Sequence, residues 1–153
     1  MGNGSVIRPG DVQLMSAGTG VVHSEYNASK TEPVHFLQIW IVPAEAGLEP
    51  TYDQRPVDRE RAGAEWVTLA AGESGTDAIP LAQDVRLGMT RLSGEGERTL
   101  EIAPGRHAWI HVVRGATSLD GAPLSEGDGV AVSGESAVTF GGGDAELLAF
   151  DLA

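Results

Sequence analysis

The residues best suited to chemistry in this sequence are His23 and Glu25, which one serine separates within a short strand-like run. Side chains two residues apart in a β-strand point to the same face. The pair would therefore offer an imidazole nitrogen and a carboxylate oxygen to one point, a mixture that suits iron, manganese, nickel, copper or zinc. Such metals normally take three or four protein ligands, so two residues are not a complete site. An ordinary strand with a solvent-facing histidine and glutamate has the same pattern.

The three remaining histidines do not form a second pair of this kind. His35 lies in the next strand-like run and could approach the same interior, although packing near Trp40 or a place on the surface would also accommodate it. His107 and His111 are four residues apart, which in a strand places them about 13 Å from each other. We therefore expect the C-terminal half to be metal-free. Two chains that pool their His–Ser–Glu segments are another way to complete a site.

Short strands are the elements that would position these residues. Twenty-one glycines and eight prolines separate short apolar runs, a rhythm typical of many strands joined by tight turns. Residues 34–42 are the strongest strand signal, and residues 21–26 are predicted to be the strand that carries the histidine and the glutamate. Asp120-Gly121 predicts a hairpin turn. Further strands are predicted around 12–16, 66–70, 84–92, 98–102, 108–114, 127–132, 137–140 and 146–152, which together indicate a sandwich or barrel.

Residues 43–65 differ in character from the rest of the chain. They hold three prolines and three arginines with little apolar periodicity, and 44–49 is the only stretch that favours a helical turn. We interpret 44–65 as a connecting segment between a first unit, 1–43, and a second unit, 66–153. Gly10-Asp11 and Gly127-Asp128 each precede an apolar strand, a weak internal repeat that fits a duplicated β-barrel.

The composition excludes several classes of partner. The net charge is −12, with 10 basic residues against 22 acidic ones, so nucleic acid is not an expected partner. No apolar run approaches the roughly 20 residues of a membrane span. Residues 1–13 show no apolar core of a signal peptide, so a cytoplasmic protein is expected. Cysteine is absent, which excludes disulfide and thiol chemistry.

The run of residues 10–25, GDVQLMSAGTGVVHSE, closely resembles the signature of pirin-like proteins, which are bicupins. The resemblance continues through 35–40 (HFLQIW) and 52–55 (YDQR), and with lower specificity through 109–115 and 148–152. It implies an all-β fold of cupin-type β-barrels in a bicupin arrangement. In these terms, 1–43 would be the remainder of the N-terminal barrel and 66–153 the C-terminal barrel.

The resemblance also assigns ligands. In that family the metal sits in the N-terminal barrel, held by three histidines and one glutamate, and His23 matches the third histidine and Glu25 the glutamate. The first two histidines belong to a His-x-His motif that lies upstream in family members and does not occur here. The first barrel and its divalent transition-metal site are therefore expected to be incomplete. Uncovered strand edges and apolar interior would favour a homo-oligomer, a dimer formed through the N-terminal half.

Pirin-like relatives include quercetin 2,3-dioxygenases, which use a barrel-bound metal and oxygen to open a flavonol ring. By resemblance, Glu25 would be a metal ligand and a candidate base for the hydroxyl of a flavonol-like substrate. Two alternatives remain: a non-catalytic binding or regulatory cupin that acts through a protein partner, and a truncated remnant that keeps the fold without the chemistry. The missing histidines favour these alternatives, and metal content would separate them from the enzyme.

Overall fold

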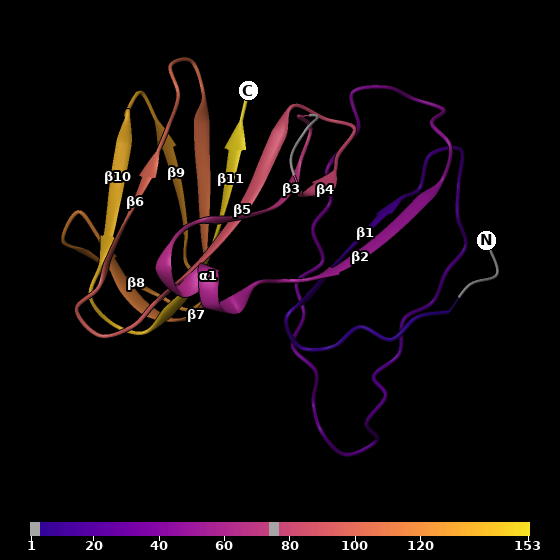
Figure 1. The fold of residues 1–153 in the computed structure, drawn as a ribbon, viewed down its shortest axis with the longest axis horizontal. Coiled ribbons are helices and arrows are strands. Elements are labelled where there is room, and N and C mark those ends of the chain that lie inside the picture. The colour runs from indigo at the N-terminus through magenta and orange to yellow at the C-terminus, as the bar shows by residue number, and fades with distance from the viewer. Residues whose placement is uncertain (1–3, 74–76) are drawn as a thin grey trace.

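The computed structural model describes residues 4–73 and 77–153, and it is almost entirely β (Figure 1). A two-stranded ribbon lies beside a nine-stranded curled sheet, which confirms the predicted all-β, cupin-type fold. The elements are β1 (Asp11–Ser16), β2 (Thr51–Pro56), α1 (Arg59–Ala64), β3 (Val67–Ala71), β4 (Ile79–Pro80), β5 (Val85–Leu92), β6 (Glu97–Glu101), β7 (His107–Leu119), β8 (Ala122–Ser125), β9 (Gly129–Ser133), β10 (Ala137–Gly141) and β11 (Ala145–Leu152).

The large sheet is built around β7 and β11. Its strand order is β4-β3-β5-β11-β7-β10-β6, and β8 and β9 also pair with β7. β11 is paired along its whole length with β5 on one side and β7 on the other, both antiparallel. The first part of β7 pairs with β9 and its last part with β8 and β10. Because one long strand serves different neighbours along its length, the sheet curls into the half-barrel seen in Figure 1.

Two apolar layers cover the two faces of this sheet. Alternation along β11 sends Leu147 into the barrel interior and Leu148 to the outer face. Val12 and Leu14 of β1 pack against the outer layer, so the ribbon is joined to the large sheet by apolar contact. The interior is filled by buried side chains from β5 to β11: Leu92, Ile102, Ala108, Ile110, Val112, Val132, Val138, Phe140, Ala145, Leu147 and Ala149.

The strands predicted in the second half are all present, with shifted ends. The predicted Asp120-Gly121 hairpin turn is also confirmed, since it joins β7 to β8. Asp120 and Gly121 have φ of 47° and 85°, the pair of positive values that a type I′ turn requires. β7 is longer than predicted because it continues past Gly115, whose φ of 78° tolerates a bend that a side chain would oppose.

The strands predicted at 21–26 and 34–42 are wrong. Residues 17–50 contain no strand or helix, and nearly all of them are exposed. A strand is held by backbone hydrogen bonds to a neighbouring strand, and residues 21–42 make none within the described part of the chain. Val22 and Trp40 are 102% and 86% exposed, so their apolar side chains are left uncovered.

The helical turn predicted at 44–49 is also wrong, because this stretch forms bends whose Ala44 amide donates to the Ala82 carbonyl oxygen. Instead, β2 and α1 lie within 44–65. Asp58 caps α1 by accepting a hydrogen bond from the Arg61 amide at 3.0 Å. The signal was an aspartate placed before Arg-Glu-Arg-Ala, a helix-starting pattern that the preceding Pro56 obscured.

The helix α1 is fastened to the large sheet at its C-terminal end. Arg98 of β6 donates to the carbonyl oxygens of Gly63 and Ala64. The Thr90 hydroxyl of β5 lies within hydrogen-bond distance of the carbonyl oxygens of residues 62 and 65 and donates to one of them at a time. These are carbonyls that a helix end leaves without a partner inside the helix. The connection between ribbon and sheet is therefore fixed by both polar and apolar contacts. Within the described ranges, no helix has the length and hydrophobicity needed to cross a membrane.

Candidate functional site

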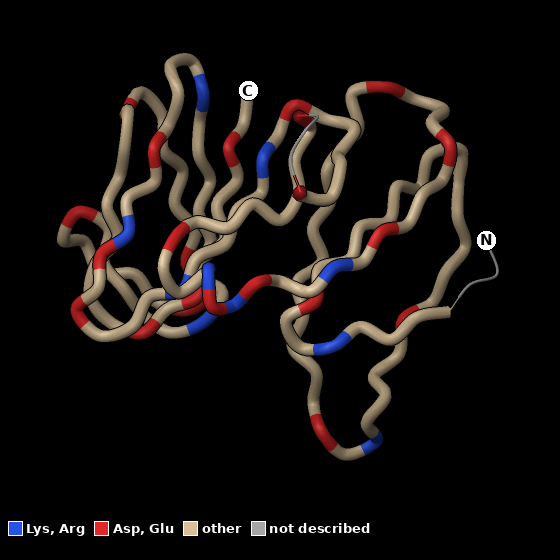
Figure 2. The backbone as a smooth tube through the Cα atoms, viewed as in Figure 1, with Lys and Arg blue, Asp and Glu red and all other residues tan. Residues whose placement is uncertain are grey.

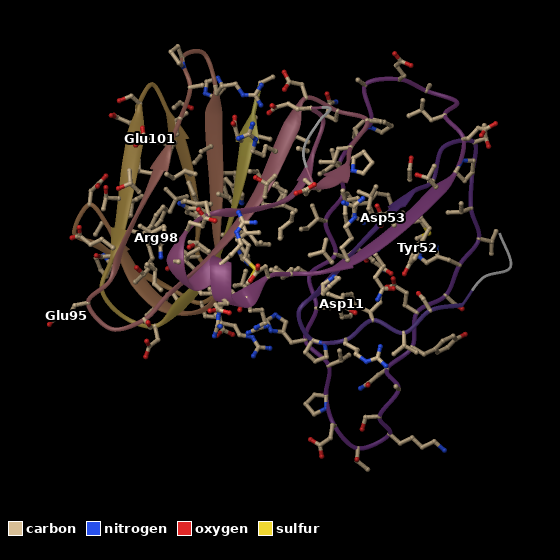
Figure 3. The ribbon with its side chains drawn as sticks, viewed as in Figure 1. Asp11, Tyr52, Asp53, Glu95, Arg98 and Glu101 are labelled. Atoms are coloured by element: carbon tan, nitrogen blue, oxygen red, sulfur yellow. The ribbon has the colours of Figure 1, made fainter. Side chains whose placement is uncertain are left out.

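The ribbon of β1 and β2 presents one apolar and one polar face. Gln13 lies opposite Gln54 and Met15 opposite Tyr52 in the antiparallel register, so these four side chains share a face. Val12 and Leu14 take the other face of β1, which packs on the large sheet. The polar face therefore points away from that sheet, and Figure 3 shows Asp11 and Tyr52 along the ribbon, well separated from Arg98.

A chain of hydrogen bonds runs along this polar face and ends at Glu25. The Gln13 side-chain amide donates to Glu25 Oε1 at 2.5 Å. The Tyr52 hydroxyl lies 3.1 Å from Gln13 Oε1 and 2.7 Å from Gln54 Oε1; it has one hydrogen and can donate to only one of them at a time. The Gln54 amide in turn donates to Asp11 Oδ2 at 2.9 Å. Glu25 is thus held by the ribbon although its own segment is irregular.

His23 and Glu25 are both exposed and lie in the irregular segment that follows β1. Only Glu25 has a side-chain partner among the described residues. In residues 4–73 and 77–153, no three His, Cys, Asp or Glu side chains come close enough to hold a metal ion together. One imidazole and one carboxylate fall short of the three or four protein ligands that transition metals take. The residues described here therefore do not make a complete metal site by themselves.

The other histidines lie elsewhere. His35 Nδ1 is 3.3 Å from Arg114 Nη2, so the ring accepts a hydrogen bond from the large sheet. His107 Nδ1 is 2.8 Å from the Ser133 hydroxyl. His111 lies in β7 opposite Gly129 of β9. Among the described residues, His35 and His23 do not belong to a group of three metal-ligating side chains.

Gln13, Tyr52 and Gln54 were missed as site residues by the sequence reasoning. The alternation of Gln13 with Val12 and Leu14 did indicate that Gln13 faces away from an apolar layer. Tyr52 and Gln54 lie in a stretch interpreted as a connection, and only the register of β2 against β1 places them beside Gln13. The sequence contains no pattern from which the register of β2 against β1 could be predicted.

Three ion pairs lie near the ribbon and at the rim of the large sheet. On β2, the hydrogen bond from Arg55 lowers the pKa of Asp53, with a further lowering from the charge of Arg55. At the rim, the hydrogen bonds to Asp151 and then to Asp84 raise the pKa of Arg106 above its ordinary value. These pairs fix the orientation of the side chains that form them.

Comparison with known proteins identifies this arrangement. The family described as "Quercetinase C-terminal cupin domain" matches residues 68–152, and the family described as "Pirin" matches residues 1–41. The chain belongs to the pirin-like cupin family. The predicted resemblance is thereby confirmed, and the first match covers the curled sheet from β3 to β11.

The relatives are longer than this chain. The "Quercetin 2,3-dioxygenase" of Escherichia coli K12 is 39% identical over 153 residues, covering 99% of this chain and 65% of that protein. A "Pirin-like protein" of Caulobacter vibrioides is 35% identical, covering 100% of this chain and 66% of that protein. The chain therefore spans just under two thirds of the length of these relatives.

Two solved structures are similar to this chain over nearly all of its length. The crystal structure of YhhW from Escherichia coli is 38% identical, with a TM-score of 0.91, and the match covers 100% of this chain and 64% of that one. The structure of the bacterial pirin YhhW in complex with nickel(II) is 37% identical, with a TM-score of 0.84, covering 94% of this chain and 61% of that one. The fold of this chain is therefore similar to that of the matched part of YhhW.

Proposed function

We propose that this chain is a quercetin 2,3-dioxygenase-type cupin in which His23 and Glu25 form half of a divalent transition-metal site. The observation that carries this proposal is 39% identity to the Escherichia coli quercetin 2,3-dioxygenase across 99% of the chain. The hydrogen bond from Gln13 to Glu25 supports it, because a ligand carboxylate benefits from a partner that fixes its orientation. The metal would be iron, nickel, manganese, copper or zinc, and nickel(II) is the one named for YhhW.

Glu25 is also the proposed base toward the hydroxyl of a flavonol-like substrate. One carboxylate oxygen accepts from Gln13, and a carboxylate has a second oxygen with which to accept a substrate proton. Gln13, Gln54 and Tyr52 on the same ribbon face offer further polar contacts that suit a polyhydroxylated aromatic compound. In this proposal the substrate lies against the polar face of β1 and β2.

The remaining ligands must come from outside the described pair, and we assign them to a second copy of the chain. A homodimer formed through the N-terminal half would pool two imidazoles and two carboxylates. It would also cover the exposed apolar side chains of residues 22–42, among them Phe36 at 61% and Trp40 at 86% exposure. The proposed units are 1–43 as part of the N-terminal barrel, 44–65 as the connection, which supplies β2 to the ribbon, and 66–153 as the C-terminal barrel. The proposed location is the cytoplasm.

A non-catalytic binding or regulatory cupin is the second candidate. It is favoured by one observation: the described residues include no group of three metal-ligating side chains. In that case the exposed apolar side chains of residues 22–42 would bind a protein partner, and no flavonol would be consumed.

Flavonol consumption under oxygen separates the two candidates. We expect the chain loaded with nickel, iron or manganese to consume quercetin, and we expect Glu25→Gln and His23→Ala to abolish the activity. His107→Ala is the matched control. His107 contacts Ser133 within the large sheet, so this substitution should leave the activity unchanged. No activity with any of these metals, from a folded chain, would contradict the enzyme and favour the binding protein.

A further inference from the structure

Two arginines lie close to a single carboxylate on the outer face of the large sheet, and a third arginine lies in the same row across the strands. Glu146 of β11 lies opposite Arg91 of β5 and opposite Arg114 of β7. Residues directly opposite each other in antiparallel strands share a face. The row Arg91–Glu146–Arg114 therefore crosses three adjacent strands, and the first residue of α1, Arg59, reaches the same glutamate from above.

A bulge in β7 produces this row. The register between β11 and β7 shifts between Glu146 and Leu147, so that Leu147 faces Val112 and Glu146 faces Arg114. Val113 is the extra residue, and it packs into the outer apolar layer. Without the bulge, strict alternation would place Val113 opposite Glu146 and turn Arg114 to the other face. The bulge thus places a third arginine on the face of the sheet that carries Glu146.

The carboxylate of Glu146 can neutralise only one of the three positive charges of Arg59, Arg91 and Arg114. Arg59 Nη2 and Arg91 Nε are each 3.7 Å from Glu146 Oε2, which is too long for a hydrogen bond. Among the described residues, neither guanidinium donates a hydrogen bond, and Arg114 reaches only the ring of His35. Both Arg59 and Arg91 remain nearly half exposed, with side-chain values of 45% and 44%. Their N–H groups are therefore available to a ligand.

The other arginines from α1 to the C-terminus differ from these three because their guanidinium groups have close oxygen partners. Arg61, Arg86 and Arg106 each bind a carboxylate closely, and Arg98 is engaged by carbonyl oxygens of α1. The cluster of Arg59, Arg91 and Arg114 is thus a local excess of two positive charges in a chain whose net charge is −12. Figure 2 shows basic and acidic positions alternating around α1 at this edge of the sheet. Since neighbouring like charges repel, such a cluster is costly unless it has a counterion.

We propose that Arg59, Arg91 and Arg114 form a binding site for a small multivalent oxyanion, a phosphate or a dicarboxylate. Planar guanidinium groups match these anions through paired N–H donors. Arg59 and Arg91 meet at one oxygen atom of Glu146, so one small anion beside that carboxylate can contact both. The site lies between α1, the large sheet and the residue His35 of the irregular segment. It is separate from the polar ribbon face that carries Glu25.

The test is a titration of the full chain with inorganic phosphate, followed through the arginine Nε–H signals in NMR spectra at constant ionic strength. The site predicts saturable shifts of the Arg59 and Arg91 signals. Arg91→Gln and Arg114→Gln should each weaken binding about tenfold, because each removes a charge-assisted donor. Glu146→Gln should tighten binding about fivefold by removing the competing carboxylate.

Arg61→Gln is the matched control, since Arg61 lies on the same helix but pairs with Glu65, and it should leave the affinity unchanged. A parallel titration with malonate distinguishes the sources: saturation by both anions indicates a general oxyanion site, and saturation by phosphate alone indicates a phosphate site. Shifts that remain linear and match those caused by chloride would overturn the proposal. Equal affinity in Arg91→Gln and the unsubstituted chain would overturn it as well.

Discussion

The two Gly–Asp turns are locally alike but lead into different surroundings. Gly10 and Gly127 have φ of 93° and 90°. In each turn the aspartate that follows, Asp11 or Asp128, accepts through Oδ2 from the amide three residues earlier, at 2.9 Å and 2.8 Å. The predicted repeat is thus present in the backbone. After the first turn β1 pairs only with β2, whereas after the second β9 joins the nine-stranded sheet. A turn is set locally, but its strand depends on the neighbours that it meets.

The first and second halves of the chain also differ in how far their apolar side chains are buried. In the second half, apolar runs such as that of β11 become paired strands with side chains in two packed layers. In the first half, residues 34–42 have a stronger strand-type composition and remain irregular and exposed. Alternation and β-branching show that a segment can form a strand, yet hydrogen bonding to a partner decides whether it does.

The largest expected difference between the halves is in the cost of removing an aromatic side chain. Phe140 is fully buried and packs edge-on against Trp66, with ring centroids 6.2 Å apart. Phe140→Ala should lower the free energy of unfolding by about 3–5 kcal/mol. Trp40→Ala should change it by less than about 0.5 kcal/mol in the isolated chain, because Trp40 is 86% exposed. Urea denaturation at low protein concentration measures both. A large loss with Trp40→Ala under those conditions would show that its segment is packed within one chain.

The second largest loss of stability is expected when the hydrogen bonds between the C-terminal end of α1 and the large sheet are removed. Arg98→Met keeps most of the apolar stem but removes the donors to the carbonyl oxygens of Gly63 and Ala64, so we expect a loss of about 1–3 kcal/mol. Arg61→Met removes only the exposed pair with Glu65, which solvent screens, and should cost much less than Arg98→Met. Thermal unfolding of the two variants provides the comparison. Equal losses would mean that the end of α1 does not hold the two halves together.

The two Gly–Asp turns can be compared by substitution. Gly127→Ala and Gly10→Ala each place a side chain at positive φ, which costs about 1–2 kcal/mol. We expect the loss at Gly127 to appear in global unfolding, because its turn leads into the large sheet. At Gly10 we expect faster hydrogen exchange confined to β1 and β2, because that ribbon can open by itself. Uniformly faster exchange in Gly10→Ala would instead make the ribbon part of one cooperative unit with the sheet.

The smallest expected effect concerns pH. Because Arg55 lowers the pKa of Asp53 in the folded chain, the pair stabilises the fold above the unfolded value of about 3.9. That stability is lost as the pH falls through the lower, folded pKa. Asp53→Asn should therefore flatten the acid side of the stability profile slightly, as measured by urea unfolding between about pH 2 and 6. Glu95→Gln, at an exposed turn, is the control. An unchanged profile in Asp53→Asn would mean that solvent screens the pair completely.

The sequence was sufficient to predict the family, the strands of the second half and the hairpin at Asp120-Gly121, because these depend on local patterns that agree with the packing. The metal-site pair His23 and Glu25, which was chosen from its spacing and the family resemblance, stays a prediction. The sequence could not predict that Gln13 holds Glu25, or that β2 brings Tyr52 beside it, since both depend on strand register. For the same reason the arginine row around Glu146, which requires a bulge at Val113, could not be predicted.

The central claim is that His23 and Glu25 are half of a metal site completed by a second copy of the chain. Size-exclusion chromatography with light scattering and elemental mass spectrometry measures mass and metal in the same peak. After loading with nickel, we expect a dimer that carries metal, and His23→Ala should remove the metal. A monodisperse monomer without metal would contradict the claim. Metal retained in His23→Ala would also contradict it, because the site would then lie elsewhere.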